Sequence, residues 1–226
     1  ENGGSGVYAF SYSYLELYYT SLCNNTGWGV SCDQSEAWLW DCSIKWNWLD
    51  GVDSYGGSFV SLEGCEVSFN GLEGYWSGIS CSLESSVCAK ECNISFNGLD
   101  GVYCESSTAF VDSCFFAGNY RFGFHLSSSK RSNLTNCEFA SDGVLVEGSE
   151  LSHFLHYLEN NTVNEKPLLY IVNETNVHVS EQFGSAIIVN CQGVTVYSGS
   201  LVRKLLVSRA DVGVEVAFSS SVSLIS

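Results

Sequence analysis

A glycine followed by a β-branched or aromatic residue returns at nearly constant spacing along most of the chain, and this repeat restricts the possible folds more than any other feature. The successive steps are 23, 22, 27, 23, 22 and 20 residues. Repeats of this length are typical of solenoids, whose coils bury their apolar faces only by stacking on one another. The glycine pairs are Gly6-Val7, Gly29-Val30, Gly51-Val52, Gly78-Ile79, Gly101-Val102, Gly123-Phe124 and Gly143-Val144.

Each repeat holds three short runs of alternating apolar and polar residues, separated by turn residues. We therefore predict an all-β chain, a right-handed single-stranded parallel β-helix of about eight or nine coils of roughly 22 residues. A leucine-rich horseshoe is not supported, because its leucine spine and helical segments are missing. Intervening residues such as Ser68 and Ser95 should face solvent. The expected inward columns are Val30, Cys32, Ile79, Cys81, Val102 and Cys104; Leu39, Leu62, Ala89, Val111 and Leu134; and Ile44, Val67, Ile94, Phe116 and Phe139.

We predict one β-solenoid domain over residues 1–226 with a single interruption. Residues 1–147 carry the regular coils, and residues 184–226 resume them. Between them, in residues 148–183, the repeat is lost, and the only proline of the chain, Pro167, lies there. We interpret this stretch as a side excursion, a hairpin or a loop.

The coil pattern, Gly-Val-x-Cys with a serine-rich turn and the Asn-Ile-Ser-Phe-Asn-Gly of residues 93–98, resembles the parallel β-helix repeats of NosD-like archaeal and bacterial surface proteins. Residues 160–170 are similar to the Asn-Asn-Thr-x-Asn-Gly-Lys-Pro-Leu-x-Tyr signature of archaeal surface proteins, with Glu165 replacing the glycine. The resemblance implies a surface β-helix, and further an archaeal cell-sheath protein whose β-strand arches form continuous sheets. Its association with copper is not carried over, since methionine is absent and His153 and His156 lack further ligands. No cofactor is expected.

Eleven cysteines point to an oxidising compartment, and they recur in two inward columns. Residues of one column lie about 4.8 Å apart, inside the Cα window for a disulfide, so we expect some bridges, with Cys81–Cys104 the favoured pair. The alternative is a ladder of buried thiols that act as small apolar side chains. Cys191 stands apart and is the candidate for an intermolecular bond. The columns are Cys42, Cys65, Cys92, Cys114 and Cys137, and Cys81 and Cys104.

An asparagine occupies the same turn position of successive coils, and Asp142 continues the series. Asparagine tolerates the left-handed backbone of a sharp corner and can hydrogen-bond to the neighbouring coil. We therefore predict an asparagine ladder with a structural role. Its members are Asn47, Asn70, Asn97 and Asn119.

The chain begins at Glu1 and contains no methionine, so we expect that a signal peptide has been removed and that the protein is extracellular. Five sequons are candidates for N-glycosylation. The net charge of -16, with nine Lys and Arg, argues against nucleic acid as a partner. No apolar run approaches the ~20 residues of a membrane span, so membrane insertion is not expected. The sequon asparagines are Asn24, Asn93, Asn133, Asn160 and Asn173.

Enzymatic activity is not predicted, because no pair of carboxylates stands out at a catalytic spacing. Neither end of the sequence shows a cap, so open β-edges should join subunits head to tail. We predict an extracellular structural protein that forms a sheath, fibre or surface layer with copies of itself. The alternative is a carbohydrate-binding or polysaccharide-cleaving β-helix, since exposed aromatic residues could bind glycans or pack against a neighbouring subunit. These residues are Tyr12, Tyr14, Tyr18, Tyr19, Trp38, Trp40, Trp46 and Trp48.

Overall fold

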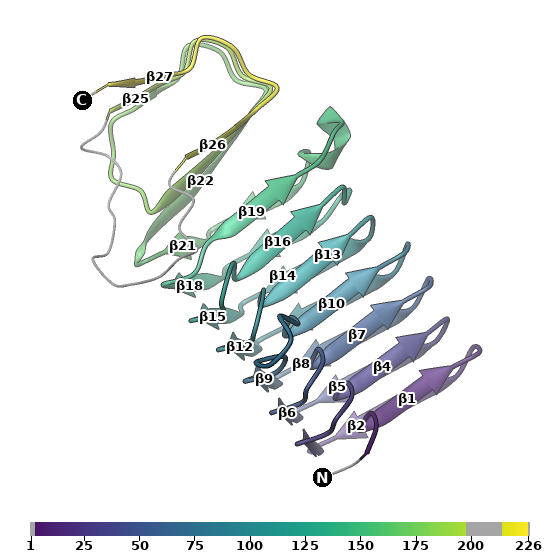
Figure 1. The fold of residues 1–226 in the computed structure, drawn as a ribbon. Helices are drawn as coiled ribbons and strands as arrows, with labels where there is room; N and C mark the ends of the chain where they lie inside the picture. The colour runs from purple at the N-terminus through teal and green to yellow at the C-terminus, as the bar shows by residue number, and fades with distance from the viewer. Residues whose placement is uncertain (1–2, 198–213, 226) are drawn as a thin grey trace.

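The structure, a computed structural model, describes residues 3–197 and 214–225. Its strands stack coil upon coil into parallel sheets (Figure 1). The first sheet contains β1 (Val7–Phe10), β4 (Val30–Asp33), β7 (Val52–Tyr55), β10 (Ile79–Ser82), β13 (Val102–Glu105), β16 (Phe124–Ser127) and β19 (Val144–Glu147). The second contains β2 (Tyr14–Tyr18), β5 (Glu36–Trp40), β8 (Phe59–Glu63), β11 (Ser86–Lys90), β14 (Thr108–Asp112), β17 (Asn133–Thr135) and β20 (Tyr157–Glu159). The third begins with β3 (Ser21–Cys23), β6 (Ser43–Lys45), β9 (Glu66–Ser68), β12 (Asn93–Ser95), β15 (Phe115–Ala117), β18 (Glu138–Ala140) and β21 (Thr162–Val163).

The predicted fold class, an all-β parallel solenoid, is confirmed. The inward columns lie in register across neighbouring strands, as for Leu39, Leu62 and Ala89 in the second sheet. All the residues predicted to face inward are buried, and they form one continuous apolar core along the stack. A single coil would expose apolar surface on both of its faces. Stacking equivalent apolar side chains of successive coils buries this surface away from water.

The repeated glycine has a steric reason. A Cβ added to Gly51 would lie 2.7 Å from the carbonyl oxygen of Gly78 and 2.7 Å from Nδ2 of Asn70. A Cβ at Gly29 would lie 2.5 Å from the carbonyl oxygen of Gly51. Because neighbouring coils approach so closely here, only a residue without a side chain fits at the start of these coils.

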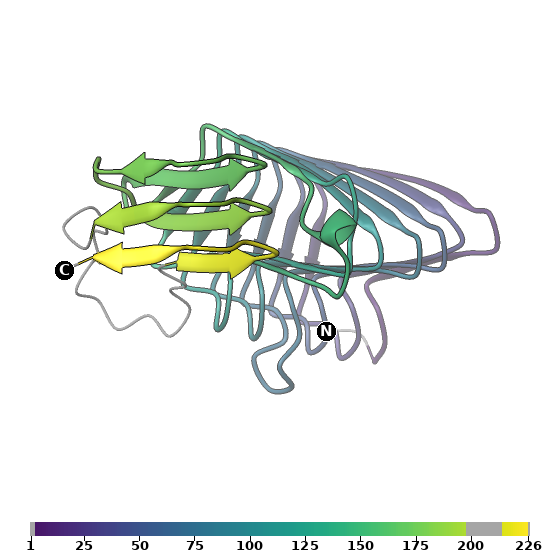
Figure 2. The same cartoon turned by 90° about the horizontal axis from the view of Figure 1, so that it is seen from above.

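The chain reverses direction after the seventh strand of each sheet. Strand β21 pairs in parallel with β18 but antiparallel with β22 (Lys166–Val172), across a turn in which Asn164 and Glu165 have φ angles of 50° and 66°. A second stack follows at the end of the first that lies away from the N-terminus (Figure 2). It consists of β22, β24 (Ser185–Val189) and β26 (Val214–Ala217), with β23 (His178–Val179), β25 (Thr195–Tyr197) and β27 (Ser223–Ile225).

Four strands, β20 to β23, lie within residues 148–183, and the predicted excursion is wrong for this part. Strands β20 and β21 complete the first stack, and β22 and β23 open the second. The segment 148–156 does leave the sheets and contains the 3₁₀ turn η1 (Leu151–His153). The pattern was hidden because β22 pairs with β24 at a separation of 17 residues, as Leu168 with Ser185, and not at the spacing of the earlier coils. Of the coils predicted over residues 184–226, residues 198–213 and 226 lie outside the described residues.

Truncation of a stacked core side chain should destabilise the whole solenoid. Leu62 is fully buried between Leu39 and Ala89, so Leu62→Ala should lower the free energy of unfolding by about 2–5 kcal/mol. Leu72→Ala, at a leucine that is 53% exposed, should change it by less than about 1 kcal/mol. Urea denaturation followed by circular dichroism measures both. Equal losses for the two variants would contradict the stacked core.

Candidate functional site

The asparagines form a continuous hydrogen-bonded ladder at the corner that follows the third sheet. The Nδ2 group of Asn47 donates to Oδ1 of Asn70 at 2.8 Å and to the carbonyl oxygen of Leu22 at 3.0 Å. The backbone N–H of Asn47 also donates to Oδ1 of Asn70, at 3.2 Å. The same bonds link the later members, and the ladder extends to Asn25 at one end and to Asp142 at the other. Each buried amide thus satisfies backbone groups of the preceding coil and bonds the side chain of the next ladder member.

We predicted that the asparagine adopts the left-handed backbone of this corner. In the structure the residue before the asparagine adopts it instead. Trp46, Phe69 and Phe96 have φ angles of 57°, 57° and 55°. Their side chains stack, with ring centroids 4.4 Å apart for Trp46 and Phe69 and 5.2 Å apart for Phe69 and Phe96. The stack ends at Gly118, where a Cβ would lie 2.7 Å from the Phe96 ring. Ring stacking offsets the cost of this conformation for bulky residues.

An insertion beside this stack builds a groove. The 27-residue step between Gly51 and Gly78 accommodates a loop over residues 71–77, which carries the exposed Leu72 and Tyr75. Tyr75 meets Tyr120 edge to face at 5.6 Å. The groove has a volume of about 610 Å³. We call the set Trp46, Phe69, Phe96, Tyr75 and Tyr120 the aromatic ledge.

The base of the ledge corrects one expectation about exposure. Ser68 and Ser95 lie on the outward side of the third sheet, yet they are 0% and 4% exposed. Each directly precedes an aromatic residue of the ledge, Phe69 or Phe96. The alternation of inward and outward residues therefore predicted the direction of these serines correctly. They are nevertheless buried, because the left-handed residue that follows each serine places an aromatic ring beside it.

The other aromatic residues named from the sequence lie on outward positions of the first two coils. Tyr12 and Tyr19 are 87% and 80% exposed. Tyr18 stacks on Trp40 of the next coil, with centroids 4.5 Å apart and planes at 6°. Trp38 contacts Trp40, and Tyr14 and Trp48 are exposed. These side chains thus make a surface of stacked rings next to the first edge of the solenoid.

The predicted disulfides are absent. All eleven cysteines lie among the described residues, and all are free thiols. Cys81 and Cys104, the favoured pair, do lie in register on adjacent strands. In an in-register parallel ladder the two Cβ atoms keep the strand spacing of about 4.8 Å, whereas a disulfide requires about 3.8 Å. The stacked geometry that brings the cysteines together therefore also keeps their sulfur atoms unbonded.

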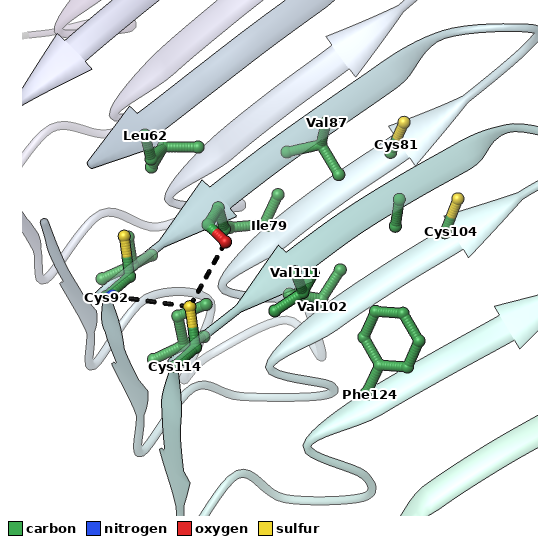
Figure 3. Packing of buried hydrophobic residues seen from close by; sticks show 14 of the residues in the cluster. Leu62, Ile79, Cys81, Val87, Cys92, Val102, Cys104, Val111, Cys114 and Phe124 are labelled. Atoms are coloured by element: carbon green, nitrogen blue, oxygen red, sulfur yellow. Dashed lines mark hydrogen bonds between the residues drawn. The ribbon is translucent and has the colours of Figure 1, made fainter. Parts of the chain in front are cut away.

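The larger cysteine column instead works as a hydrogen-bonded corner (Figure 3). The backbone N–H of Cys92 donates to Sγ of Cys114 at 3.4 Å, and this Sγ lies 3.5 Å from the carbonyl oxygen of Ala89. Cys42 and Cys114 donate in the same way to Sγ of Cys65 and Cys137. Thiols at this corner therefore bridge coils as asparagine amides do at the other. The number of cysteines then no longer argues for an oxidising compartment.

Cys191 is not available for an intermolecular bond. It is 3% exposed, and its Sγ lies 3.4 Å from the carbonyl oxygen of Ile171. Its backbone N–H donates to Oγ of Ser219 at 2.9 Å. The second stack thus repeats the corner of the first, with serine in place of the next cysteine, and the burial of Cys191 argues against the predicted intermolecular bond.

A serine ladder was missed by the sequence reasoning. It lies at the corner between the first and second sheets, where the N–H of Ser35 donates to Oγ of Ser58 at 3.1 Å. Serine is frequent throughout this chain, so composition concealed the column. Its return at the glycine spacing was the signal that could have found it. Its buried members are Ser35, Ser58, Ser85, Ser107 and Ser129.

The sequon asparagines all lie outside the core. Asn24, Asn93, Asn160 and Asn173 are exposed, and Asn133 is half-buried on β17. Their accessibility is compatible with N-glycosylation, which stays a prediction, as does the extracellular location. Among the described residues no helix is long and apolar enough to cross a membrane.

The histidines named as possible ligands are engaged in hydrogen bonds. Nδ1 of His156 accepts from the N–H of Ser132 at 3.2 Å, and its Nε2 lies 2.8 Å from the carbonyl oxygen of His153. Nδ1 of His153 accepts the N–H of Glu150 at 3.3 Å. Within residues 3–197 and 214–225, no group of three or more His, Cys, Asp or Glu side chains could hold a metal ion.

One buried acid–base pair was not anticipated. Nδ1 of His125 lies 3.0 Å from Oδ2 of Asp100, and its Nε2 lies 3.2 Å from Oε1 of Glu147 without hydrogen-bond geometry. Arg121 Nε approaches Asp100 at 3.8 Å. His125 is only 2% exposed and contacts the Tyr103 ring, at a centroid distance of 5.0 Å. A substrate cannot reach this pair, so we interpret it as structural.

Stacked coils with hydrogen-bonded corner ladders define a parallel β-helix protein. A family model described as a right handed beta helix region matches residues 28–225, so the chain belongs to the right-handed β-helix family. Among curated proteins none matches. A solved structure with some similarity is a trypsin-treated form of QnrB1, a plasmid-mediated fluoroquinolone resistance protein. It is 12% identical, and the alignment covers 98% of this chain and 91% of that chain. The TM-score of 0.28 is too low to support a shared fold or function.

In solution the cysteines should be free thiols, and most of them should be protected from chemical modification. Nine of them are buried, whereas Cys23 and Cys88 are partly exposed. Burial raises the pKa of the Cys32 thiol to about 12, which suppresses the reactive thiolate. A thiol-specific reagent should therefore modify at most two cysteines in the native protein and all eleven in denaturant. A reductant that lowers the unfolding temperature would contradict this account.

Proposed function

We propose that this protein is an extracellular structural β-helix that associates with copies of itself through its first coil. The observation that supports this is an uncovered coil edge. Strands β1, β2 and β3 are each the outer strand of their sheet, so a full coil of backbone groups lacks a neighbouring strand among the described residues. Such an edge is a template for pairing with another chain.

The apolar columns also open at this coil. Val7, Leu15 and Leu17 are only partly buried, although they occupy the same columns as residues that are 0% exposed in the next coil. A second copy placed on this edge would complete the core and gain the burial that every internal coil already has. A sheath, fibre or surface layer of the kind suggested by the resemblance to archaeal sheath proteins would be built from such contacts.

The form of the assembly depends on which edge meets the first coil. Head-to-tail growth requires β26 and β27 of a second copy to meet β1, β2 and β3. These edges differ, since the described coils of the second stack carry two strands and those of the first carry three. Two first coils can also face each other about a twofold axis, which closes a dimer and ends growth. We propose the head-to-tail fibre. The size distribution of the assemblies in solution distinguishes a fibre from a closed dimer.

A charge placed on the open column should abolish assembly. Leu17→Lys would force an unpaired ammonium group into the contact, and should weaken association at least about a hundredfold. Glu16→Lys is the matched control, because this neighbour on β2 faces outward. Analytical ultracentrifugation and electron microscopy of the folded variants should show rods for the wild type and Glu16→Lys only. A wild type that stays monomeric, or stops at dimers, would overturn the fibre.

Carbohydrate binding is a second candidate, and the aromatic ledge favours it. One face of the Trp46 indole is free of a stacked ring, because Asn24 takes the equivalent position in the first coil. An indole face can stack on a sugar ring, and the neighbouring Glu73 and Tyr75 supply polar groups along the groove. A polysaccharide chain would then lie across the ledge.

Loss of the indole should weaken this binding. Trp46→Ala should weaken the affinity for a bound polysaccharide at least about tenfold, because one aromatic contact contributes about 1.5 kcal/mol. Tyr157→Ala, at an exposed tyrosine of β20, should leave it unchanged. Affinity electrophoresis against a polysaccharide panel provides the measurement. A panel without any retarded band would remove this candidate.

A further inference from the structure

A second hollow lies on the outward face of the first sheet, at its first three coils. In register, Tyr8 lies beside Ser31 and Ser31 beside Asp53, while Asp33 lies beside Tyr55. Trp28 lines the same cavity from the corner that precedes β4. The cavity has a volume of about 320 Å³, the size of a small molecule or a single side chain.

The carboxylates of this cavity have no basic partner among residues 3–197 and 214–225. None of the ion pairs among the described residues involves Asp33 or Asp53, nor Asp50 just behind them. Asp53 accepts a hydrogen bond from Oγ of Ser31 at 3.1 Å, and Asp50 accepts one from the N–H of Ser77 at 2.6 Å. Hydrogen bonds satisfy lone pairs but leave the negative charge uncompensated.

An equivalent position elsewhere in the fold shows the contrast. Asp50 and Asp100 both directly precede the repeated glycine of their coil. Asp100 has His125 at 3.0 Å and Arg121 at 3.8 Å, whereas Asp50 has neither. The first coils therefore retain negative charge where a later coil neutralises it.

The burial of these carboxylates has a measurable consequence. Burial, with a smaller contribution from the charge of Asp33, raises the pKa of Asp53 to about 6. Burial raises the pKa of Asp50 to about 7, with a smaller contribution from Asp53. A cation within the cavity would favour the ionised forms and lower both pKa values.

We propose that this cavity binds an organic cation with an alkylammonium head, held by the carboxylates of Asp33 and Asp53 and by the rings of Tyr8, Trp28 and Tyr55. Aromatic rings attract such cations through their π faces, and quaternary ammonium groups are recognised by cages of several rings. A divalent metal ion fits less well, because Ca²⁺ takes six to eight oxygen ligands and three of the lining side chains are rings. The combination of aromatic rings with carboxylates that lack a basic partner among the described residues therefore favours an organic cation.

Titration with choline and with its neutral isostere 3,3-dimethylbutan-1-ol tests the charge requirement. Choline should bind at millimolar concentrations by calorimetry, and the alcohol at least about tenfold more weakly, because it lacks the charge that the rings and carboxylates attract. Choline affinity should fall as the pH drops through about 6, the pKa of Asp53, where this carboxylate is protonated. Nα-acetyl-lysine methylamide is a second arm, and tighter binding than choline would identify a lysine side chain as the source of the cation.

The variants keep the shape of the cavity while they change its charge. Asp53→Asn should weaken choline binding about tenfold, and Asp33→Asn should do so as well. Glu105→Gln is the matched control, since Glu105 is an exposed acid on the outward side of β13 outside the cavity. Thermal unfolding verifies that all three variants are folded. Equal binding of the alcohol, no binding of either cation, or an unchanged affinity of Asp53→Asn would overturn the proposal.

Discussion

The structure depends on hydrogen bonds that side chains make from one coil to the next. Asn70 shows the principle, because its amide accepts from the backbone and side chain of Asn47 and donates to the carbonyl oxygen of Ile44. Cysteines and serines do the same at the other two corners. A slip of one residue between coils would leave these buried groups unpaired, at a cost of about 1–3 kcal/mol for each. The ladders therefore fix the register in which the apolar columns stack.

Much of the first stack was predictable from spacing. Glycine, cysteine and asparagine return together, and alternation around them identified inward columns on all three sheets. It did not name the second buried column of the second sheet, which consists of Ala37, Val60, Val87 and Ala109. The chain reversal was not predictable, because β22 is a continuous apolar strand whose antiparallel pairing with β21 depends on the local turn at Asn164 and Glu165. The disulfide expectation failed because Cα spacing alone omits the direction of the Cβ atoms. The aromatic ledge required the positive φ of Trp46 and Phe69, a conformation that sequence propensity disfavours.

The three proposed interaction surfaces lie where the repeat is imperfect. The internal coils satisfy their neighbours on both sides and leave little for a partner. Among the described residues, the first coil lacks a neighbour, the inserted loop at residues 71–77 forms a groove, and the carboxylates of Asp33 and Asp53 form no ion pair. Each of the three proposed surfaces is thus a departure from the regular internal coils.

The exchange of side-chain amide protons with solvent tests the ladder most directly. Nuclear magnetic resonance resolves the Nδ2 protons of individual asparagines. The protons of Asn47, Asn70 and Asn97 should exchange only through global unfolding, whereas those of Asn24, an exposed asparagine at the same corner, should exchange without it. Ladder amides that exchange as fast as Asn24 would show that the coils are not joined as described.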